Sequence, residues 1–177
     1  MEEMVLNTMK DRLWEVVFEQ FYDASFMEML ASRMISFWKW VDDAAKIAIA
    51  LTTSGSTVAG LAIWNLPQFH WLWVAISACC ALLAIVHSSF SVSDRLRAWE
   101  GLRVRSTKLR NDFECLLNRM KMNAGFDINQ LDKDYQALKK ELIEIQLLEP
   151  ADQFANRSRQ LAAQADLNEQ IKDMLES

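Results

Sequence analysis

The chain has 177 residues, a formal net charge of −5 and 51% hydrophobic residues, an average that hides a very uneven distribution of charge. From Ile47 to Val92, 46 consecutive residues include no Asp, Glu, Lys or Arg. Charged side chains are mostly found on protein surfaces, so a run of this length excludes an ordinary water-soluble domain over that stretch.

The first 43 residues are predicted to form a helix outside the membrane core, in the cytoplasm or at the membrane interface. Apolar residues recur in this region at helical spacing, at Leu6, Met9, Leu13, Val16, Val17 and Phe21. Nearer to the charge-free run the side chains become bulkier. We expect this part to lie along the interface or to pack against a neighbouring subunit.

The charge-free run is long enough for two membrane spans, since roughly 20 apolar residues cross a bilayer core of about 30 Å. Pro67 lies in a short polar segment between two apolar stretches and is expected to end the preceding helix. We therefore predict an all-α membrane protein with a transmembrane helical hairpin over residues 44–91, made of spans at 44–64 and 69–90 and a turn at 65–68. Tryptophan favours the membrane–water boundary, and the predicted interface residues are Trp38, Trp40, Trp64, Trp71 and Trp73.

A cluster of small, mostly hydroxylated residues lies in the middle of the first predicted span. Thr52, Ser56 and Gly60 are four residues apart, a spacing of small residues that lets helices pack closely. The alternative interpretation is that Thr53, Ser54 or Thr57, around the back of that stripe, lines a water-filled path in an oligomer. The packing and pore interpretations are compatible, and both stay open.

The second predicted span contains an ionisable residue, His87, near its inner end. Ionisable groups inside a span point to function by default. His87 also lies close enough to the basic flank to reach the lipid headgroups. An interfacial or packed His87 and a pore or pH-sensing His87 are the two alternatives.

Basic residues orient the hairpin. The turn contains no Lys or Arg, whereas basic residues lie on both flanks, at Arg33, Lys39, Lys46, Arg95, Arg97, Arg103, Arg105, Lys108 and Arg110. Positively charged flanks remain on the cytoplasmic side, so both termini are predicted to be inside. The basic flank after the second span is also compatible with a specific lipid or nucleotide site.

Residues 92–177 are predicted to form a cytoplasmic helical domain. The first helix carries an apolar heptad stripe, proposed as an oligomer seam, at Trp99, Leu102, Leu109, Phe113 and Leu116, with Ser106 and Met120 in the same register. Asp127 is expected to cap a second helix with Gln130 as its partner, and Pro150 to close it. The expected stripe of that helix is Leu131, Tyr135, Leu138, Leu142, Ile145 and Leu148; a third helix is expected around Phe154, Leu161, Ala165, Ile171 and Leu175.

No convergent set of reactive residues is found, so no enzymatic activity, cofactor or metal is predicted. The sequence has only two histidines, no Cys-x-x-Cys and no glycine-rich phosphate loop. Cys79, Cys80 and Cys115 are interpreted as reduced. No direct nucleic-acid binding is expected, and the partners predicted from this pattern are membrane lipids and further copies of the chain.

The run that follows the second span carries a motif of Ser, acid, Arg, Arg, Glu and Leu, at Ser93, Asp94, Arg95, Arg97, Glu100 and Leu102. The hairpin, this motif and the helices after it resemble the SLATT family, bacterial two-span proteins associated with nucleotide-signalling defence systems. The resemblance covers about residues 25–150. It implies an inner-membrane effector that oligomerises or opens on phage infection and stops growth, with a nucleotide second messenger or a cognate sensor protein as its trigger.

Two functional hypotheses follow. The first is an oligomeric, pore-forming effector of anti-phage, abortive-infection defence. The alternative is a membrane anchor or scaffold that recruits a soluble partner through the cytoplasmic helices. A phage-type holin shares the hairpin but does not call for so large a cytoplasmic part.

Overall fold

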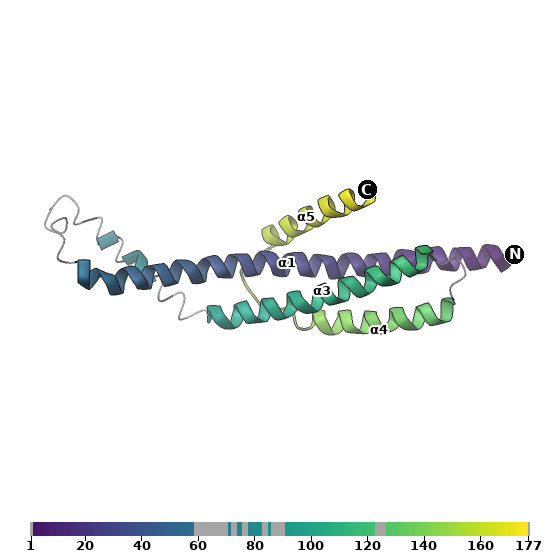
Figure 1. Cartoon of the computed structure of the whole chain (residues 1–177), viewed down its shortest axis with the longest axis horizontal. Helices are drawn as coiled ribbons and strands as arrows, with labels where there is room; N and C mark the ends of the chain where they lie inside the picture. The colour runs from purple at the N-terminus through teal and green to yellow at the C-terminus, as the bar shows by residue number, and fades with distance from the viewer. Residues whose placement is uncertain are drawn as a thin grey trace. The chain divides into compact units, whose positions relative to one another are not determined.

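The computed structural model describes residues 2–58, 71, 74–75, 78–82, 85, 91–122 and 127–176 (Figure 1). Its helices are α1 (Glu2–Val58), α3 (Val92–Met122), α4 (Ile128–Gln146) and α5 (Arg157–Glu176). Every regular element in these ranges is helical, which confirms the all-α prediction for this part of the chain.

Across the described ranges, no helix is both long enough and apolar enough to cross a membrane. The two predicted spans fall largely outside those ranges, because residues 59–70 and most of 72–90 are not described. The side chains of residues 51–58 are not described either.

The chain divides into two compact units. One combines Met1–Met34 with Ala98–Ser177, and the other is Ile35–Arg97. The first unit, called here the bundle unit, contains the beginning of α1, most of α3 and the whole of α4 and α5. The N-terminal helix and the C-terminal helical domain, which were predicted as separate regions, thus contribute to one unit.

A seven-residue repeat of buried residues runs along α1. Val17, Ala24, Ala31, Trp38 and Ala45 are seven positions apart, and each exposes at most 1% of its surface. Residues at this spacing return to the same helix face, so α1 presents one continuous packing face. α1 is uninterrupted because the chain has no proline before Pro67 and no glycine before Gly55, and these two residue types are the strongest helix breakers.

The heptad stripe predicted on α3 is confirmed as a buried face. Trp99, Ser106, Leu109 and Phe113 are fully buried, and Leu102, Leu116 and Met120 expose at most 8% of their surface. Ser106 is unusual on this face, because its buried hydroxyl oxygen has no hydrogen-bond partner among the described residues. A small polar residue here is tolerated at a cost rather than required by the packing.

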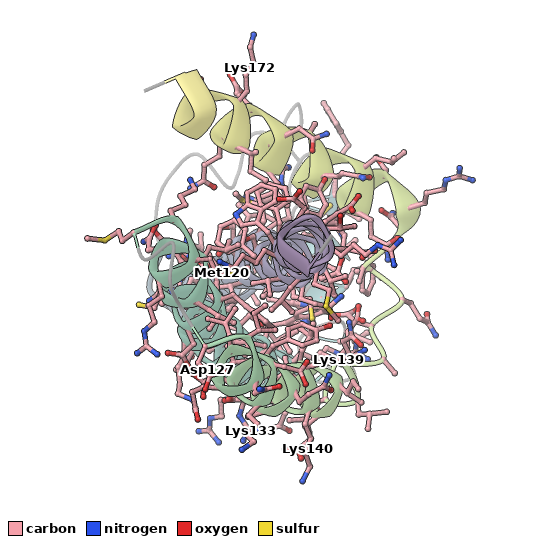
Figure 2. The ribbon with its side chains drawn as sticks, turned by 90° about the vertical axis from the view of Figure 1, so that its right-hand side faces the viewer. Met120, Asp127, Lys133, Lys139, Lys140 and Lys172 are labelled. Atoms are coloured by element: carbon pink, nitrogen blue, oxygen red, sulfur yellow. The ribbon has the colours of Figure 1, made fainter. Side chains whose placement is uncertain are left out.

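Within the bundle unit, α1 and α3 run antiparallel, with α4 against α3 and α5 on the opposite side of α1 (Figures 1 and 2). An ion pair joins the first two helices, with Arg110 Nη1 lying 3.3 Å from Glu28 Oε2. Both side chains are mostly buried, so the pair fixes which levels of α1 and α3 face each other.

The predicted start of α4 is confirmed in part. Asp127 is the N-cap, and its side chain accepts a hydrogen bond of 2.9 Å from the Asn129 backbone N–H. Gln130 does not complete a capping box, because its side-chain amide donates forward to Asp134 at 2.9 Å. α4 buries Leu131, Tyr135, Leu142 and Ile145, as its periodicity predicts. Leu148, expected on the same face, is 51% exposed.

The third helix predicted around Phe154, Leu161, Ala165, Ile171 and Leu175 is confirmed as α5. Among the described side chains, α5 buries Ala163 and Leu167, whereas Leu161 is 55% exposed and Ala165 is exposed. The apolar residues that indicated the helix are therefore largely not the ones that it buries. The helix begins after Asn156, whose side chain accepts from the Arg159 backbone N–H at 3.1 Å.

Candidate functional site

Two polar contacts attach α5 to α1 in the bundle unit. The Arg33 guanidinium binds the Asp166 carboxylate, with Nε donating to Oδ2 at 3.0 Å. The Tyr22 hydroxyl donates to Asn168 Oδ1 at 2.7 Å. In each contact the two partners are more than 130 positions apart in sequence. These polar contacts add to the apolar contact that α5 makes through its buried residues Ala163 and Leu167.

Two ion pairs join α4 to α3, and one of them is also a hydrogen bond. Lys108 Nζ donates to Glu141 Oε1 at 2.9 Å, and this hydrogen bond raises the pKa of Lys108. Arg119 lies 3.6 Å from Asp134. Exposed pairs of this kind are weak because water screens them, so the buried apolar face of α4 dominates.

The connection between α4 and α5 is attached to α3 through a buried tryptophan. Trp99 is fully buried, and its indole Nε1–H donates to Asp152 Oδ2 at 3.0 Å. Asp152 also accepts from the Phe154 backbone N–H at 3.0 Å, forming a local turn. The Trp99 side chain thus combines core packing with positioning of the loop that leads into α5.

The motif residues after the second predicted span begin α3. Ser91 has a positive φ of 45°, and its carbonyl accepts from the Asp94 N–H at 2.9 Å. Asp94 is the acidic residue of the first turn, where a negative charge is favoured by the helix dipole. Arg95 lies over the Trp38 ring, 5.4 Å from its centroid. Ser93 and Arg97 are exposed, and Glu100 is half-buried.

The five residues predicted as an oligomer seam are covered by the same chain. Trp99, Leu102, Leu109, Phe113 and Leu116 each expose at most 4% of their surface in the single chain. A contact between copies through these side chains therefore requires the bundle unit to open. A closed copy must use other surfaces to associate.

The predicted interface tryptophans differ in environment. Trp38 is 1% exposed and packs against Phe37 and Arg95, so it is not available to lipid in this structure. Trp40 and Trp71 expose 68% and 71% of their surface. Trp64 and Trp73 lie outside the described residues.

Most of the predicted pore or packing residues are not described at the level of side chains. Thr52, Thr53, Ser56 and Thr57 lie in the last turns of α1, where the helix is described but the side chains are not. Gly60 and His87 lie outside the described residues. Whether these residues line a path or pack helices together stays a prediction.

The described part of the bundle unit contains hollows on either side of α3. One, of about 210 Å³, is lined by aromatic residues of α1, including Trp14 and Phe18, whose stacked ring centroids are 5.2 Å apart, with Leu117 of α3 and Ile171 of α5. The other, of about 550 Å³, lies between α3 and α4 beside Cys115, Arg119 and Asp134. All three cysteines are free thiols, as predicted.

An acidic row on α1 was missed as a feature, although its spacing is visible in the sequence. Asp11, Glu15, Glu19 and Asp23 are each four residues apart, and we call this row the acidic ladder. Carboxylates at this spacing are neighbours on a helix and repel one another. Burial, with a further contribution from Glu19, raises the pKa of Asp23 above its ordinary value of 3.8. The ladder is thus a destabilising arrangement within one copy.

Replacing Asp23 with Asn is expected to stabilise the chain by a few tenths of a kcal/mol at neutral pH, because it removes one like-charge contact. The native carboxyl holds its proton to higher pH than the unfolded one, so its stability contribution falls as pH rises from about 3.8 through the raised native value. Urea unfolding at a series of pH values should therefore show a smaller loss of stability over that interval in Asp23→Asn. Asp173→Asn, an exposed position on α5, is the matched control. An Asp23→Asn protein with unchanged stability at every pH would show that the ladder carries no strain.

Among the described residues, no group of three or more His, Cys, Asp or Glu side chains is arranged to hold a metal ion. Comparisons with protein families, with curated proteins and with solved structures give no match to this chain. The resemblance to the SLATT family therefore stays a prediction made from the residues alone.

Proposed function

We propose that the chain is a two-span effector of the bacterial inner membrane, with both termini in the cytoplasm, that associates into an oligomer and forms or gates a pore. In this proposal it acts in abortive-infection defence against phage, in line with the SLATT-like motif. It binds membrane lipids and further copies of itself, and it responds to a nucleotide second messenger or a cognate sensor protein. No catalytic activity is part of the proposal.

The observation that carries the membrane part is the exposure of apolar side chains within the charge-free run. Trp71, Val74, Leu82 and Ile85 expose 71%, 56%, 61% and 60% of their surface, and Ile47 exposes 61%. Exposed apolar surface costs about 25 cal/mol per Å² in water, and contiguous patches mark surfaces that contact something else. Lipid is the apolar environment that matches a run of 46 residues without a charge.

The pore part rests on the composition of the first span. A simple anchor needs only apolar residues, whereas Thr52, Thr53, Ser56 and Thr57 place four hydroxyls near its middle. Two helices cannot enclose a path, so permeation requires several copies. Thr53 and Thr57, beside the packing stripe, then give such a path a polar lining.

The test is dye or ion flux through liposomes that contain the purified full-length chain. Thr53→Leu and Thr57→Leu replace hydroxyls with apolar side chains of larger size, and each is expected to lower flux at least about tenfold if the face lines the path. Thr107→Leu makes the same exchange on α3, outside the predicted spans, and should conduct like the wild type. Equal flux through all four proteins would rule out this face as the pore lining.

The scaffold alternative is favoured by one observation, the separate bundle unit formed by residues 1–34 and 98–177. A unit with its own buried core can recruit a soluble partner without any pore. In that case the reconstituted wild type conducts nothing, and the hydroxyls serve only helix packing.

A further inference from the structure

Exposed basic and apolar side chains form a stripe on the outward face of α4. Lys133 and Lys140 are seven residues apart and exposed, and Ile143 and Leu147 lie on the same side with 48% and 81% of their surface exposed. We call these four residues the lysine face. Figure 2 shows Lys133 and Lys140 pointing away from α1, at the far edge of the bundle unit. Glu144 shares this side of the helix and lowers its net charge by one.

The acidic ladder on α1 has the complementary character. Asp11, Glu15 and Glu19 are exposed and Asp23 is half-buried. The ladder extends over twelve residues, a rise of about 18 Å, and Val16 adds a partly exposed apolar side chain at its edge. Arg12 lies beside it and offsets one of the four charges.

Neither surface contributes to the ion pairs that join α1, α3, α4 and α5 among the described residues. Those pairs include Arg33 with Asp166, Lys108 with Glu141 and Arg119 with Asp134. Lys133 and Lys140 point away from α1 at the edge of the bundle unit, so they cannot reach the ladder on α1 of the same copy (Figure 2). Opposite charges that cannot meet within one molecule can meet between two.

We propose that the lysine face on α4 of one copy docks against the acidic ladder on α1 of a second copy. The contact sets lysines against carboxylates and places Ile143 and Leu147 beside Val16. It forms either twice in a reciprocal dimer or head to tail in a ring. This proposal rests on the self-association in the proposed function and is independent of the pore.

The physical reason for this pairing is relief of repulsion on both sides. Four carboxylates in one row repel each other in the free copy, and lysines from a partner reduce that repulsion on docking. Each exposed ion pair is weak, so the contact depends on several pairs together and on low salt. Confinement of the chains to one membrane raises their effective concentration and compensates for weak individual contacts.

Two charge-reversal variants test the pairing in the full-length chain in neutral detergent. The ladder variant carries Glu15→Lys and Glu19→Lys, and the face variant carries Lys133→Glu and Lys140→Glu. Fluorescence energy transfer between labelled copies reports association. Each variant alone should associate about tenfold or more weakly than the wild type. An equimolar mixture should recover wild-type association, because the reversed ladder now matches the reversed face.

All reversed positions are exposed, so each variant is expected to keep the wild-type helical circular dichroism. A chain carrying all four reversals should again associate with itself, which separates pairing from damage to the fold. Single variants that associate like the wild type, or a mixture that fails to recover, would overturn the proposal. Loss of binding to anionic vesicles by the face variant, without recovery on mixing, would assign the lysine face to lipid instead and overturn it equally.

Association through the spans could mask these differences, so a second measurement addresses the contact itself. Carbodiimide joins carboxylates to lysine amines that touch, and an equal mixture of ¹⁴N and ¹⁵N copies distinguishes links between copies from links within one. We expect mixed-isotope links from Glu15 or Glu19 to Lys133 or Lys140. If the mixed links join other residues only, the proposed contact is absent. The liposome flux assay is unaffected by this result, so failure of the contact and failure of the pore are distinguishable.

Discussion

Trp99→Ala is expected to lower the free energy of unfolding by about 3 to 5 kcal/mol, the range for removing a large aromatic side chain from a core. Trp99 is fully buried on α3, and its indole N–H is bonded to Asp152 in the connection between α4 and α5. The substitution therefore removes packing from the heptad face and releases the loop that precedes α5. Urea unfolding of the full-length chain in neutral detergent measures the loss.

Two further substitutions separate packing from hydrogen bonding. Trp99→Phe keeps most of the ring and removes the donor, so it should cost only about 1 kcal/mol. Trp40→Ala removes the same side chain from a site where it is 68% exposed and should change stability by less than about 1 kcal/mol. If Trp99→Ala were no more harmful than Trp40→Ala, the bundle unit would not be held together around Trp99.

Ala31→Leu is the second substitution with a large expected effect, a loss of about 1 to 3 kcal/mol from overpacking. Ala31 is fully buried in the seven-residue repeat of α1, one turn beyond Glu28. Ser106, also fully buried, lies about one turn from Arg110 on the antiparallel α3. Ala31 and Ser106 thus lie at the same height along the two helices, where small side chains allow close packing. The three carbon atoms that leucine adds at position 31 have no room there.

Ala137→Leu is the matched control, because it makes the same exchange at an exposed position in the middle of α4. It should change stability by less than about 0.5 kcal/mol, and thermal unfolding followed by circular dichroism can compare the two. A tolerated leucine at position 31 would mean that α1 and α3 are not in close contact there.

The sequence predicted helices best where each had one apolar face. The stripe on α3 and most of the stripe on α4 were correct because polar residues separate their apolar positions clearly. The packing face of α1 was missed because three of its five repeat positions are alanines, which do not stand out among bulkier neighbours such as Met29 and Phe26. α1 also packs against α3 on one side and α5 on another, so apolar residues outside the seven-residue repeat, such as Leu30 and Met34, are buried as well and obscure the repeat.

The polar contacts could not be predicted from the sequence. Arg33 meets Asp166, and Tyr22 meets Asn168, over more than 130 residues, and no local pattern encodes such a pairing. The residues that α5 buries, Ala163 and Leu167, could not be predicted for the same reason, since the position of α5 depends on these distant partners. The basic residues after the second predicted span were visible in the sequence, but their acidic partners, such as Glu141 for Lys108, appeared only with the fold.

The proposed two-span hairpin, with both termini in the cytoplasm, is tested most directly by labelling single cysteines in intact cells. Cys79, Cys80 and Cys115 are first replaced, and one cysteine is then placed at Gln68 in the predicted turn or at Met122 on α3. A membrane-impermeant maleimide should label Gln68→Cys in intact cells and Met122→Cys only after the membrane is permeabilised. Labelling of both positions only after permeabilisation, with the chain extracted from membranes by alkaline carbonate, would contradict the account.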